Sequence, residues 1–151
     1  KLGLLSGYAL EQEVSDAQKL SYQADAHYFG HGVPINKKAA LRLYMAAADA
    51  GDTRAAYLVG KCCVEEETMA KEVLRMMEKK QAVTDYGLAS LLKACDANHM
   101  DALYYTAKLY DDPPILTITK NVKEALKYYY RGAKGSHVQS MIAFANKLLD
   151  G

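Results

Sequence analysis

KAALRLYMAAADAGDTRAAYLVGKCC, which runs from Lys38 to Cys63, recurs twice in degenerate form along this chain of 151 residues. A shift of 47 residues aligns it without gaps with Asp85 to Tyr110, and a shift of 85 residues aligns it with Lys123 to Leu148. The three copies are therefore 47 and then 38 residues apart. Periods of about 34 to 47 residues are typical of solenoids built from two-helix units. The residues that coincide are mostly apolar, aromatic or basic: Leu41 with Leu88, Ala47 with Ala94, Tyr57 with Tyr104, Lys61 with Lys108, Ala40 with Ala125, Leu41 with Leu126 and Tyr44 with Tyr129.

Each copy predicts two helices separated by a tight turn. Apolar residues recur at three- and four-residue spacing in both, which gives each helix one apolar face. Gly51 ends the helix that carries Leu41 and Tyr44, because glycine adopts the left-handed conformation needed there. Asp52 is a suitable N-cap for the following helix, near residues 52–64, which begins the next repeat. The small residues Ala47, Ala94 and Ala133 should be buried where helices approach closely. The two apolar faces comprise Leu41, Tyr44, Ala47 and Ala48, and then Ala55, Val59 and Cys63.

The repeats extend into one solenoid domain over residues 1–151. A further helix, roughly Asp16 to Phe29, precedes the first copy and ends at two glycines and a proline, Gly30, Gly32 and Pro34. Residues 68–80 are helix-prone and break the period, so we predict an inserted helix or an extension of its neighbour. Residues 115–119 are expected to form an extended connector. About three and a half repeats result, near 16–51, 52–98 with the insertion, 99–136, and a partial repeat or cap at 137–151.

The best-preserved copy carries a specific order of short motifs. The turn Gly30-His31-Gly32-Val33 is followed by Asn36, Ala40-Leu41, Leu43-Tyr44, Ala47-Ala48 and Gly51, and Val59-Gly60 lies in the next helix. This order resembles the Sel-1-like repeat, a relative of the tetratricopeptide repeat. The resemblance implies an all-α, right-handed superhelical solenoid of antiparallel helix-turn-helix repeats that serves as an assembly platform. The middle turn departs from the pattern through the insertion, and the third turn has Pro113-Pro114 instead of glycines.

Composition argues against several partners. The chain has 19 basic and 18 acidic residues, a net charge of +1, which disfavours duplex nucleic acid and anionic membranes as partners. No apolar run approaches the roughly 20 residues that span a bilayer, so no membrane insertion is expected. The three cysteines are odd in number and two are adjacent, which does not fit a disulfide framework. We therefore expect an intracellular, cytoplasmic protein; a leader removed before Lys1 is the alternative.

Candidate chemistry is sparse. His27 and His31 have the spacing of two metal ligands on one helix, but Gly30 falls between them where the turn begins. Cys62 and Cys63 could be a reactive pair, yet Cys63 occupies a packing position, which favours a small buried side chain. No paired carboxylates, Ser-His-Asp set or glycine-rich phosphate loop has the context its chemistry needs. We expect no metal, no cofactor and no enzymatic activity.

Two functions remain. The favoured one is a scaffold or adaptor that binds another protein or a peptide segment in the concave groove of the superhelix. The alternative is a helical-repeat nucleic-acid-binding module that uses stacked tyrosines, against which the near-neutral charge counts. The insertion at 68–80 is either a dedicated contact surface or merely a longer helix.

The expected binding surface follows from the fold of related two-helix solenoids, in which the first helix of each unit lines the groove. Tyr57 and Lys61 should face the groove, and Tyr104 and Lys108 repeat this pair one copy later. Tyrosine provides rigid contact area and lysine provides charge pairing, so an extended or helical segment with carboxylates and apolar side chains would suit this surface. The alternative is that both tyrosines simply pack between adjacent helices. The full predicted set is Ser21, Asp25, Arg54, Tyr57, Lys61, Asp101, Tyr104, Lys108, Ile142 and Asn146.

Overall fold

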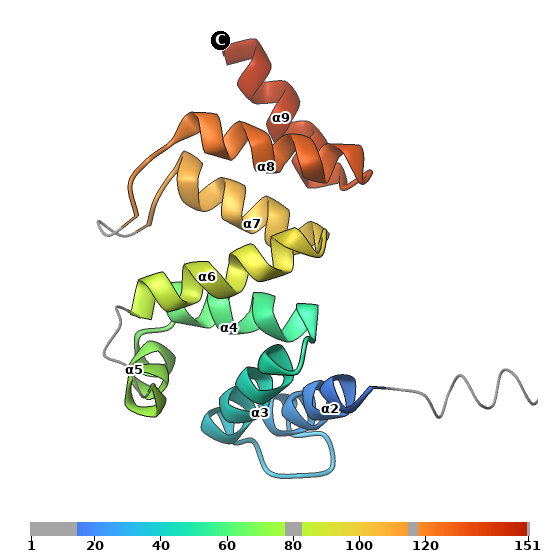
Figure 1. The fold of residues 1–151 in the computed structure, drawn as a ribbon, viewed down its shortest axis with the longest axis vertical. Coiled ribbons are helices and arrows are strands. Elements are labelled where there is room, and N and C mark those ends of the chain that lie inside the picture. Colours follow the sequence, from blue (N-terminus) through green and yellow to red (C-terminus); the bar gives the residue numbers. More distant parts are fainter. Residues whose placement is uncertain (1–14, 78–82, 115–117, 151) are drawn as a thin grey trace, which may run out of the picture.

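The computed structural model describes residues 15–77, 83–114 and 118–150, and every regular element in these ranges is an α-helix. This confirms the all-α prediction. The helices stack along the long axis of the molecule, with α2 and α3 at one end and α9 at the other (Figure 1). They are α2 (Asp16–Phe29), α3 (Lys37–Asp49), α4 (Thr53–Glu65), α5 (Glu67–Met76), α6 (Val83–Asp96), α7 (Met100–Asp111), α8 (Val122–Lys134) and α9 (Val138–Asp150).

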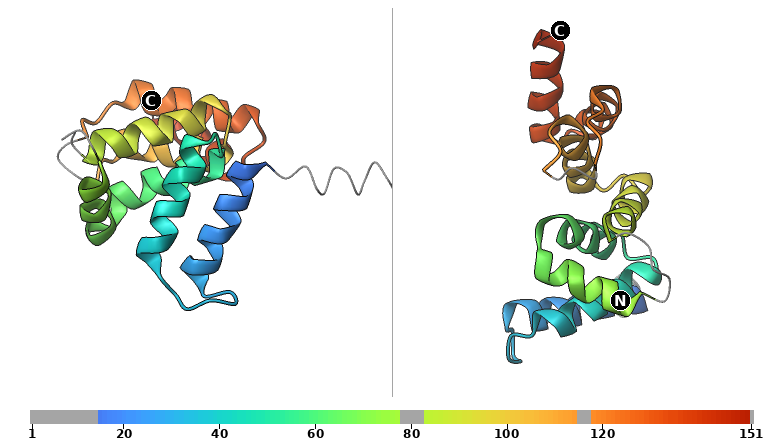
Figure 2. Two further views of the ribbon diagram at one scale, coloured as in Figure 1. Left: turned by 60° about the horizontal axis from the view of Figure 1, so that its bottom comes forward. Right: turned by 90° about the vertical axis from the view of Figure 1, so that its left-hand side faces the viewer.

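The helices pair with near neighbours in the sequence. The most extensive contacts are α2 with α3, α4 with α6, and α7 with α8, and α9 packs on α8. Every extensive contact in the described ranges joins helices no more than two elements apart, so the two ends of the stack do not meet (Figure 2). This is the arrangement of a solenoid rather than of a closed bundle.

Polar side chains fix where the helices begin. Asp52 caps α4 as predicted, because its carboxylate accepts a hydrogen bond from the amide of Ala55 at 2.9 Å. Gly51, just before it, has φ +102°, a left-handed conformation that fits glycine. Histidine occupies the aligned position in the next two copies. His99 Nδ1 accepts from the amide of Ala102 at 3.2 Å, and His137 Nδ1 accepts from that of Ser140 at 3.3 Å.

Small residues lie where helices touch, although the third copy differs from the prediction. Ala47 and Ala94 are 0% exposed, as expected. Ala133, however, is only half-buried, so the prediction that it is almost fully buried is wrong. The enclosed position belongs to Gly132, where an added Cβ would lie 2.3 Å from Ser140 Oγ of α9. Gly132 is also the residue that aligns with Ala47 when the shift is 85 residues.

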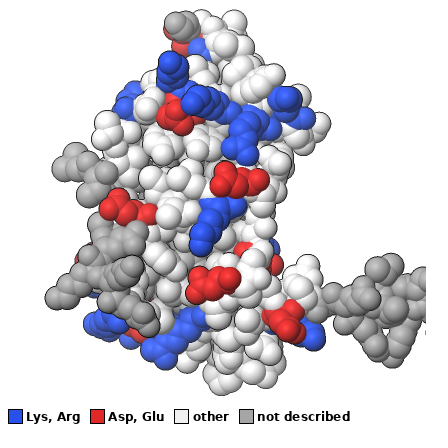
Figure 3. All heavy atoms as spheres, in the orientation of Figure 1, with Lys and Arg blue, Asp and Glu red and all other residues white. Residues whose placement is uncertain are grey.

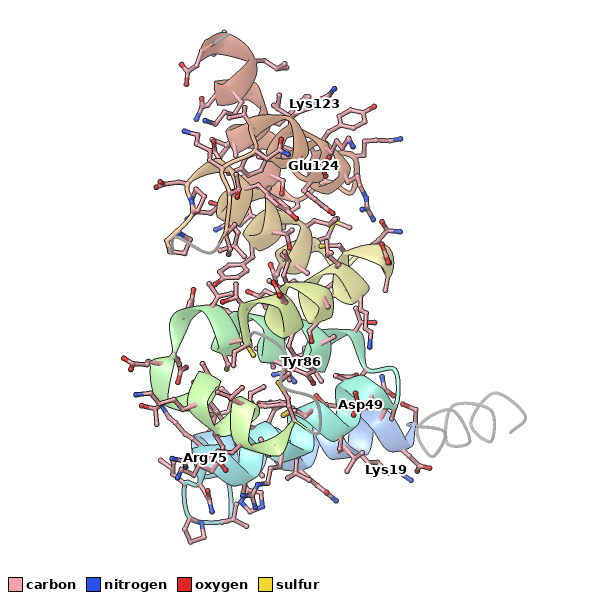
Figure 4. All side chains as sticks on the ribbon, turned by 60° about the vertical axis from the view of Figure 1, so that its left-hand side comes forward. Lys19, Asp49, Arg75, Tyr86, Lys123 and Glu124 are labelled. Carbon is pink, nitrogen blue, oxygen red and sulfur yellow. The ribbon has the colours of Figure 1, made fainter. Side chains whose placement is uncertain are left out.

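The insertion is a separate helix. Residues 68–76 are helical, Met77 follows the end of α5, and residues 78–80 of the predicted segment lie outside the described residues. Met69 and Val73 bury themselves in the same core as Leu41 and Val59. The buried Glu72 pairs with Arg42 of α3 at 3.1 Å, with Lys38 at 3.7 Å, and with Arg75 of α5, labelled in Figure 4, at 3.3 Å. The insertion is therefore anchored to α3.

Candidate functional site

Five of the predicted residues line one surface pocket of about 280 Å³. They come from α4 and α7, the first helices of the second and third repeats, and Gln139 of α9 closes one side. We call this the tyrosine–lysine pocket. Its lining residues are Tyr57, Lys61, Glu65, Asp101, Tyr104, Tyr105, Lys108 and Gln139.

Tyr57 and Lys61 form the α4 side of the pocket. The Tyr57 ring stacks on His99 with centroids 5.0 Å apart and meets the edge of Tyr105 at 6.1 Å. Lys61 Nζ lies 5.9 Å from the ring centroids of both Tyr57 and Tyr105, which is within the range of cation–π attraction. Burial raises the pKa of Tyr57.

Tyr104 and Lys108 repeat this arrangement on α7. Lys108 Nζ lies 5.6 Å from the Tyr104 ring centroid. The ring packs against Tyr129 of α8 at 6.0 Å and against His137 at 5.6 Å. Both predicted tyrosines thus pack between helices with part of the ring and line the pocket with the rest. Packing between helices and exposure to a binding surface are therefore compatible for these two residues.

The charges of the pocket are only partly paired. Asp101 Oδ1 lies 3.3 Å from His137 Nε2. Within the described ranges, neither Lys61 nor Lys108 has a carboxylate oxygen within 4.0 Å; each ammonium instead faces tyrosine rings. A ligand carboxylate could therefore pair with either lysine without first breaking a salt bridge.

Three lining residues, Glu65, Tyr105 and Gln139, were not predicted. Tyr105 is half-buried. Burial, and to a smaller extent the nearby Glu65 carboxylate, raises the pKa of its hydroxyl. No signal for it is present in the sequence, because the 47-residue shift aligns Tyr105 with Leu58 rather than with a second tyrosine. Glu65 lies one turn beyond Lys61 and could have been found by extending the same helical face.

Three other predicted residues form a polar cluster with Tyr44, which we call the Arg54 cluster. Arg54 Nη1 donates to Ser21 Oγ at 3.2 Å and to Asp25 Oδ2 at 3.0 Å, and Nη2 donates to Asp25 Oδ1 at 2.9 Å. The Tyr44 hydroxyl also donates to Asp25. Burial alone would raise the pKa of Asp25, but these hydrogen bonds from Arg54 and Tyr44 lower it. The cluster ties α2, α3 and α4 together.

A second pocket of about 300 Å³ connects the two groups of residues. It lies beside the Arg54 cluster and shares Lys61 and Glu65 with the tyrosine–lysine pocket. Asn146 lines neither pocket and is exposed on α9, as is Ile142. Acidic and basic side chains are interspersed over the face drawn in Figure 3.

Known proteins resemble this chain in fold rather than in sequence. Neither a protein-family model nor a curated protein matches the sequence. Among solved structures, a protective antigen of uropathogenic Escherichia coli strains, described as displaying an SLR fold, superposes with a TM-score of 0.70 over 89% of this chain at 21% identity. A Sel1 repeat protein from Oxalobacter formigenes superposes with a TM-score of 0.67 over 86% of this chain at 18% identity. The chain has the Sel1-like repeat fold.

The resemblance noted from the sequence is thus confirmed in the fold. The chain spans 26% and 47% of the lengths of these two Sel1-like structures. Within the described ranges, no helix is long and apolar enough to cross a membrane.

The cysteines of this Sel1-like solenoid serve its packing. Cys63 and Cys95 are buried, Cys62 is half-buried, and all three are free thiols. Burial raises the pKa of Cys62 to about 11 and that of Cys63 to about 12, which keeps both in the unreactive thiol form. In the described part of the chain, no three His, Cys, Asp or Glu side chains are placed to hold a metal ion.

Proposed function

We propose that this chain is a non-enzymatic protein–protein interaction scaffold, and that the tyrosine–lysine pocket binds a segment of its partner. The observation that carries the proposal is the repetition of one arrangement on two consecutive first helices. Each helix presents a half-buried tyrosine ring with an ammonium group above it, and neither ammonium is paired with a carboxylate in the described structure. The three free thiols fit a protein of the reducing cytoplasm.

The chemistry of the pocket suits an acidic and partly apolar segment. Pre-packed tyrosines lose little side-chain entropy on binding and supply apolar contact area, which is why they are enriched at binding hot spots. Lys61 and Lys108 would pair with carboxylates of the segment, and Asp101 would favour a basic or amide group at the opposite side. Mixed charges of this kind contribute to partner choice more than to affinity.

Nucleic acid fits the pocket less well. The Lys61 and Lys108 ammonium groups share the lining of the pocket with the carboxylates of Glu65 and Asp101, so the pocket offers no continuous basic surface for phosphates. The tyrosines are also packed on neighbouring rings, which limits the area available for stacking bases.

Quantitative affinity capture from a lysate of the source cells would test the proposal. The baits are the unaltered chain, Lys61→Glu and Tyr104→Ala. Two matched controls are Lys93→Glu, an exposed lysine of α6, and Tyr130→Ala, an exposed tyrosine of α8. Circular dichroism and thermal unfolding establish that all five proteins fold.

The proposal predicts at least one protein that is enriched by the unaltered chain and by both controls, and depleted about tenfold or more by both pocket variants, a loss of roughly 1.4 kcal/mol or more. Binding of that protein should then be reproduced with purified components. A partner lost with the α6 or α8 control but retained by both pocket variants would overturn the assignment of the pocket. Retention of nucleic acid by the chain, removed by Lys61→Glu, would instead support the alternative function.

A further inference from the structure

The pocket beside the Arg54 cluster has mostly aromatic and apolar walls, and we call it the aromatic pocket. The Phe29 ring, at the end of α2, is 54% exposed and meets the Tyr28 ring edge to face with centroids 4.9 Å apart. Lys37 Nζ lies 5.2 Å from the Tyr28 ring centroid, so this aromatic surface already attracts one cation. Besides Arg54 and the two residues shared with the tyrosine–lysine pocket, the lining consists of Tyr28, Phe29, Tyr44, Leu58, Cys62 and Glu66.

The aromatic pocket and the tyrosine–lysine pocket are the same site in consecutive repeats. α4 forms a wall of both pockets, and Lys61 and Glu65 line both. A segment that follows the groove from one repeat to the next would therefore pass both pockets. The 47-residue shift aligns three lining residues of the first pocket with three of the second: Arg54 with Asp101, Leu58 with Tyr105 and Lys61 with Lys108.

The charges of the aromatic pocket favour a cation. Its two carboxylates, Glu65 and Glu66, have no basic nitrogen within 4.0 Å in the described ranges. They lie at the C-terminal end of α4, where the helix dipole adds partial negative charge. Of the two cations in the lining, Arg54 is already held by Asp25, which leaves Lys61 to oppose the two carboxylates.

The Cys62 thiol reports the balance of these charges at the pocket wall. Burial contributes most to raising its pKa, and the Glu66 and Glu65 carboxylates raise it further. Each carboxylate has a larger effect than either of the opposing ammonium groups, Lys61 and Lys37. The electrostatic field at the wall therefore favours a positively charged ligand group, although two lysines lie nearby.

We propose that the aromatic pocket binds a basic side chain, arginine or lysine, of the same partner segment whose acidic residue pairs with Lys61. This inference rests on the proposed function. The Phe29 ring would pack against the cation, and the Glu66 carboxylate would pair with it. Adjacent helices pack about 8–10 Å apart and an extended chain advances about 3.3 Å per residue, so the basic residue should lie about three positions from the acidic one.

Selection from a library of random displayed peptides by the full 151-residue chain tests the proposal. Enriched peptides should combine an acidic residue with an arginine or lysine at that spacing. Phe29→Ala and Glu66→Gln should each lose the basic residue from the enriched sequences and keep the acidic one. Two controls line neither pocket and should select the same peptides as the unaltered chain: Tyr22→Ala, a similarly exposed aromatic residue of α2, and Glu67→Gln, an exposed glutamate of α5. Thermal unfolding establishes that all variants fold.

A second measurement isolates the basic residue. One enriched peptide is compared by fluorescence anisotropy with the same peptide carrying norleucine in place of its arginine or lysine. The norleucine peptide should bind the unaltered chain about fivefold more weakly, as expected for one cation–π contact with a partly exposed ion pair. Glu66→Gln should reduce this difference, because it removes the carboxylate that faces the cation.

The outcomes separate this inference from the proposed function. Enriched peptides without a basic residue, a basic residue retained by both Phe29→Ala and Glu66→Gln, or a norleucine peptide that binds as tightly as its parent would overturn the inference alone. Enrichment that is unaffected by Lys61→Glu and Tyr104→Ala, or no enrichment at all, would overturn the proposed function and this inference with it.

Discussion

The Arg54 cluster and the tyrosine–lysine pocket occupy similar places on successive first helices, yet they use their charges in opposite ways. Arg54 is fully engaged by Asp25 and Ser21 of the neighbouring helix. Lys61, two turns further along the same helix, contacts the Tyr57 and Tyr105 rings and has no carboxylate oxygen within 4.0 Å in the described part of the chain. The position in the repeat thus determines which helix face a residue occupies. The adjacent helix determines whether a charged side chain on that face is paired in a salt bridge. We therefore expect the first region to stabilise the solenoid, and we propose the second as the surface that a partner contacts.

The largest expected effect concerns the rigid packing beneath both regions. Ala47→Leu should lower the free energy of unfolding by about 3 kcal/mol, because the larger side chain enters a fully enclosed position. Ala46→Leu on the same helix is the control, and it should be close to neutral because Ala46 is exposed. Urea unfolding of both variants measures the difference. Equal free energies of unfolding for the two variants would show that the helix contact at Ala47 has room for a larger side chain.

Breaking the Arg54 cluster should cost somewhat less. Asp25→Ala should lower the free energy of unfolding by about 2 kcal/mol, because it leaves the buried Tyr44 hydroxyl and Arg54 without their acceptor. Asp16→Ala on the same helix, whose carboxylate is almost fully exposed, should cost about 0.5 kcal/mol or less.

The cluster should also respond to acid. The pKa of Asp25 lies below its unfolded value of about 3.9, so its contribution is complete above that pH and is lost as the pH falls through the folded pKa. Asp25→Ala should lack this part of the pH dependence, which unfolding curves between pH 2 and 6 would show.

The helix caps give a third contrast between the regions. Asp52 caps α4, whereas His99, which stacks on Tyr57, caps α7. Burial lowers the pKa of His99, although Asp101 opposes the shift, and only the neutral ring can accept the hydrogen bond from Ala102. Stability from this cap should be complete above the unfolded pKa of about 6.5 and be lost as the pH falls below it.

His99→Asn tests this contrast, because asparagine caps a helix without titrating. It should reduce the loss of stability that the unaltered chain shows as the pH falls below about 6.5. An identical pH profile for His99→Asn and the unaltered chain would show that the cap does not respond to pH.

The smallest effect is expected for the unpaired lysine. Lys61→Met should lower the free energy of unfolding by about 1 kcal/mol or less, because it removes the cation–π contacts with Tyr57 and Tyr105 but no salt bridge. Arg54→Met should cost clearly more, because it leaves Asp25 with Tyr44 alone. Chemical denaturation measures the loss in free energy of unfolding for the salt-bridged Arg54 and for the unpaired Lys61. Equal losses would contradict the claim that only Arg54 stabilises the fold through its charge.

The sequence predicted the parts that depend on periodicity. The bounds of α2, the Asp52 cap and the left-handed Gly51 follow from local rules that involve neighbouring residues only. The pocket was found because Tyr57 and Lys61 recur one copy later at the same helical positions. The parts that failed depend on contacts between helices.

Ala133 was misplaced because a one-residue change of register moves a side chain about 100° around its helix, which exchanged it with Gly132. The engagement of Arg54 by Asp25, separated by 29 residues, could not be predicted, since it depends on how α2 and α4 are set against each other. The inserted helix was recognised, but the buried Glu72 that anchors it was not, because its three cations come from two different helices.

Site-specific photo-cross-linking is the most direct test of the claim that the tyrosine–lysine pocket is the binding site. Benzoylphenylalanine replaces Tyr104 in one protein and Tyr130 of α8 in another, and both are irradiated in a lysate of the source cells. The account predicts a discrete adduct with one cellular protein from position 104, competed by excess unaltered chain and absent from position 130. An adduct from position 130 with none from position 104 would contradict it.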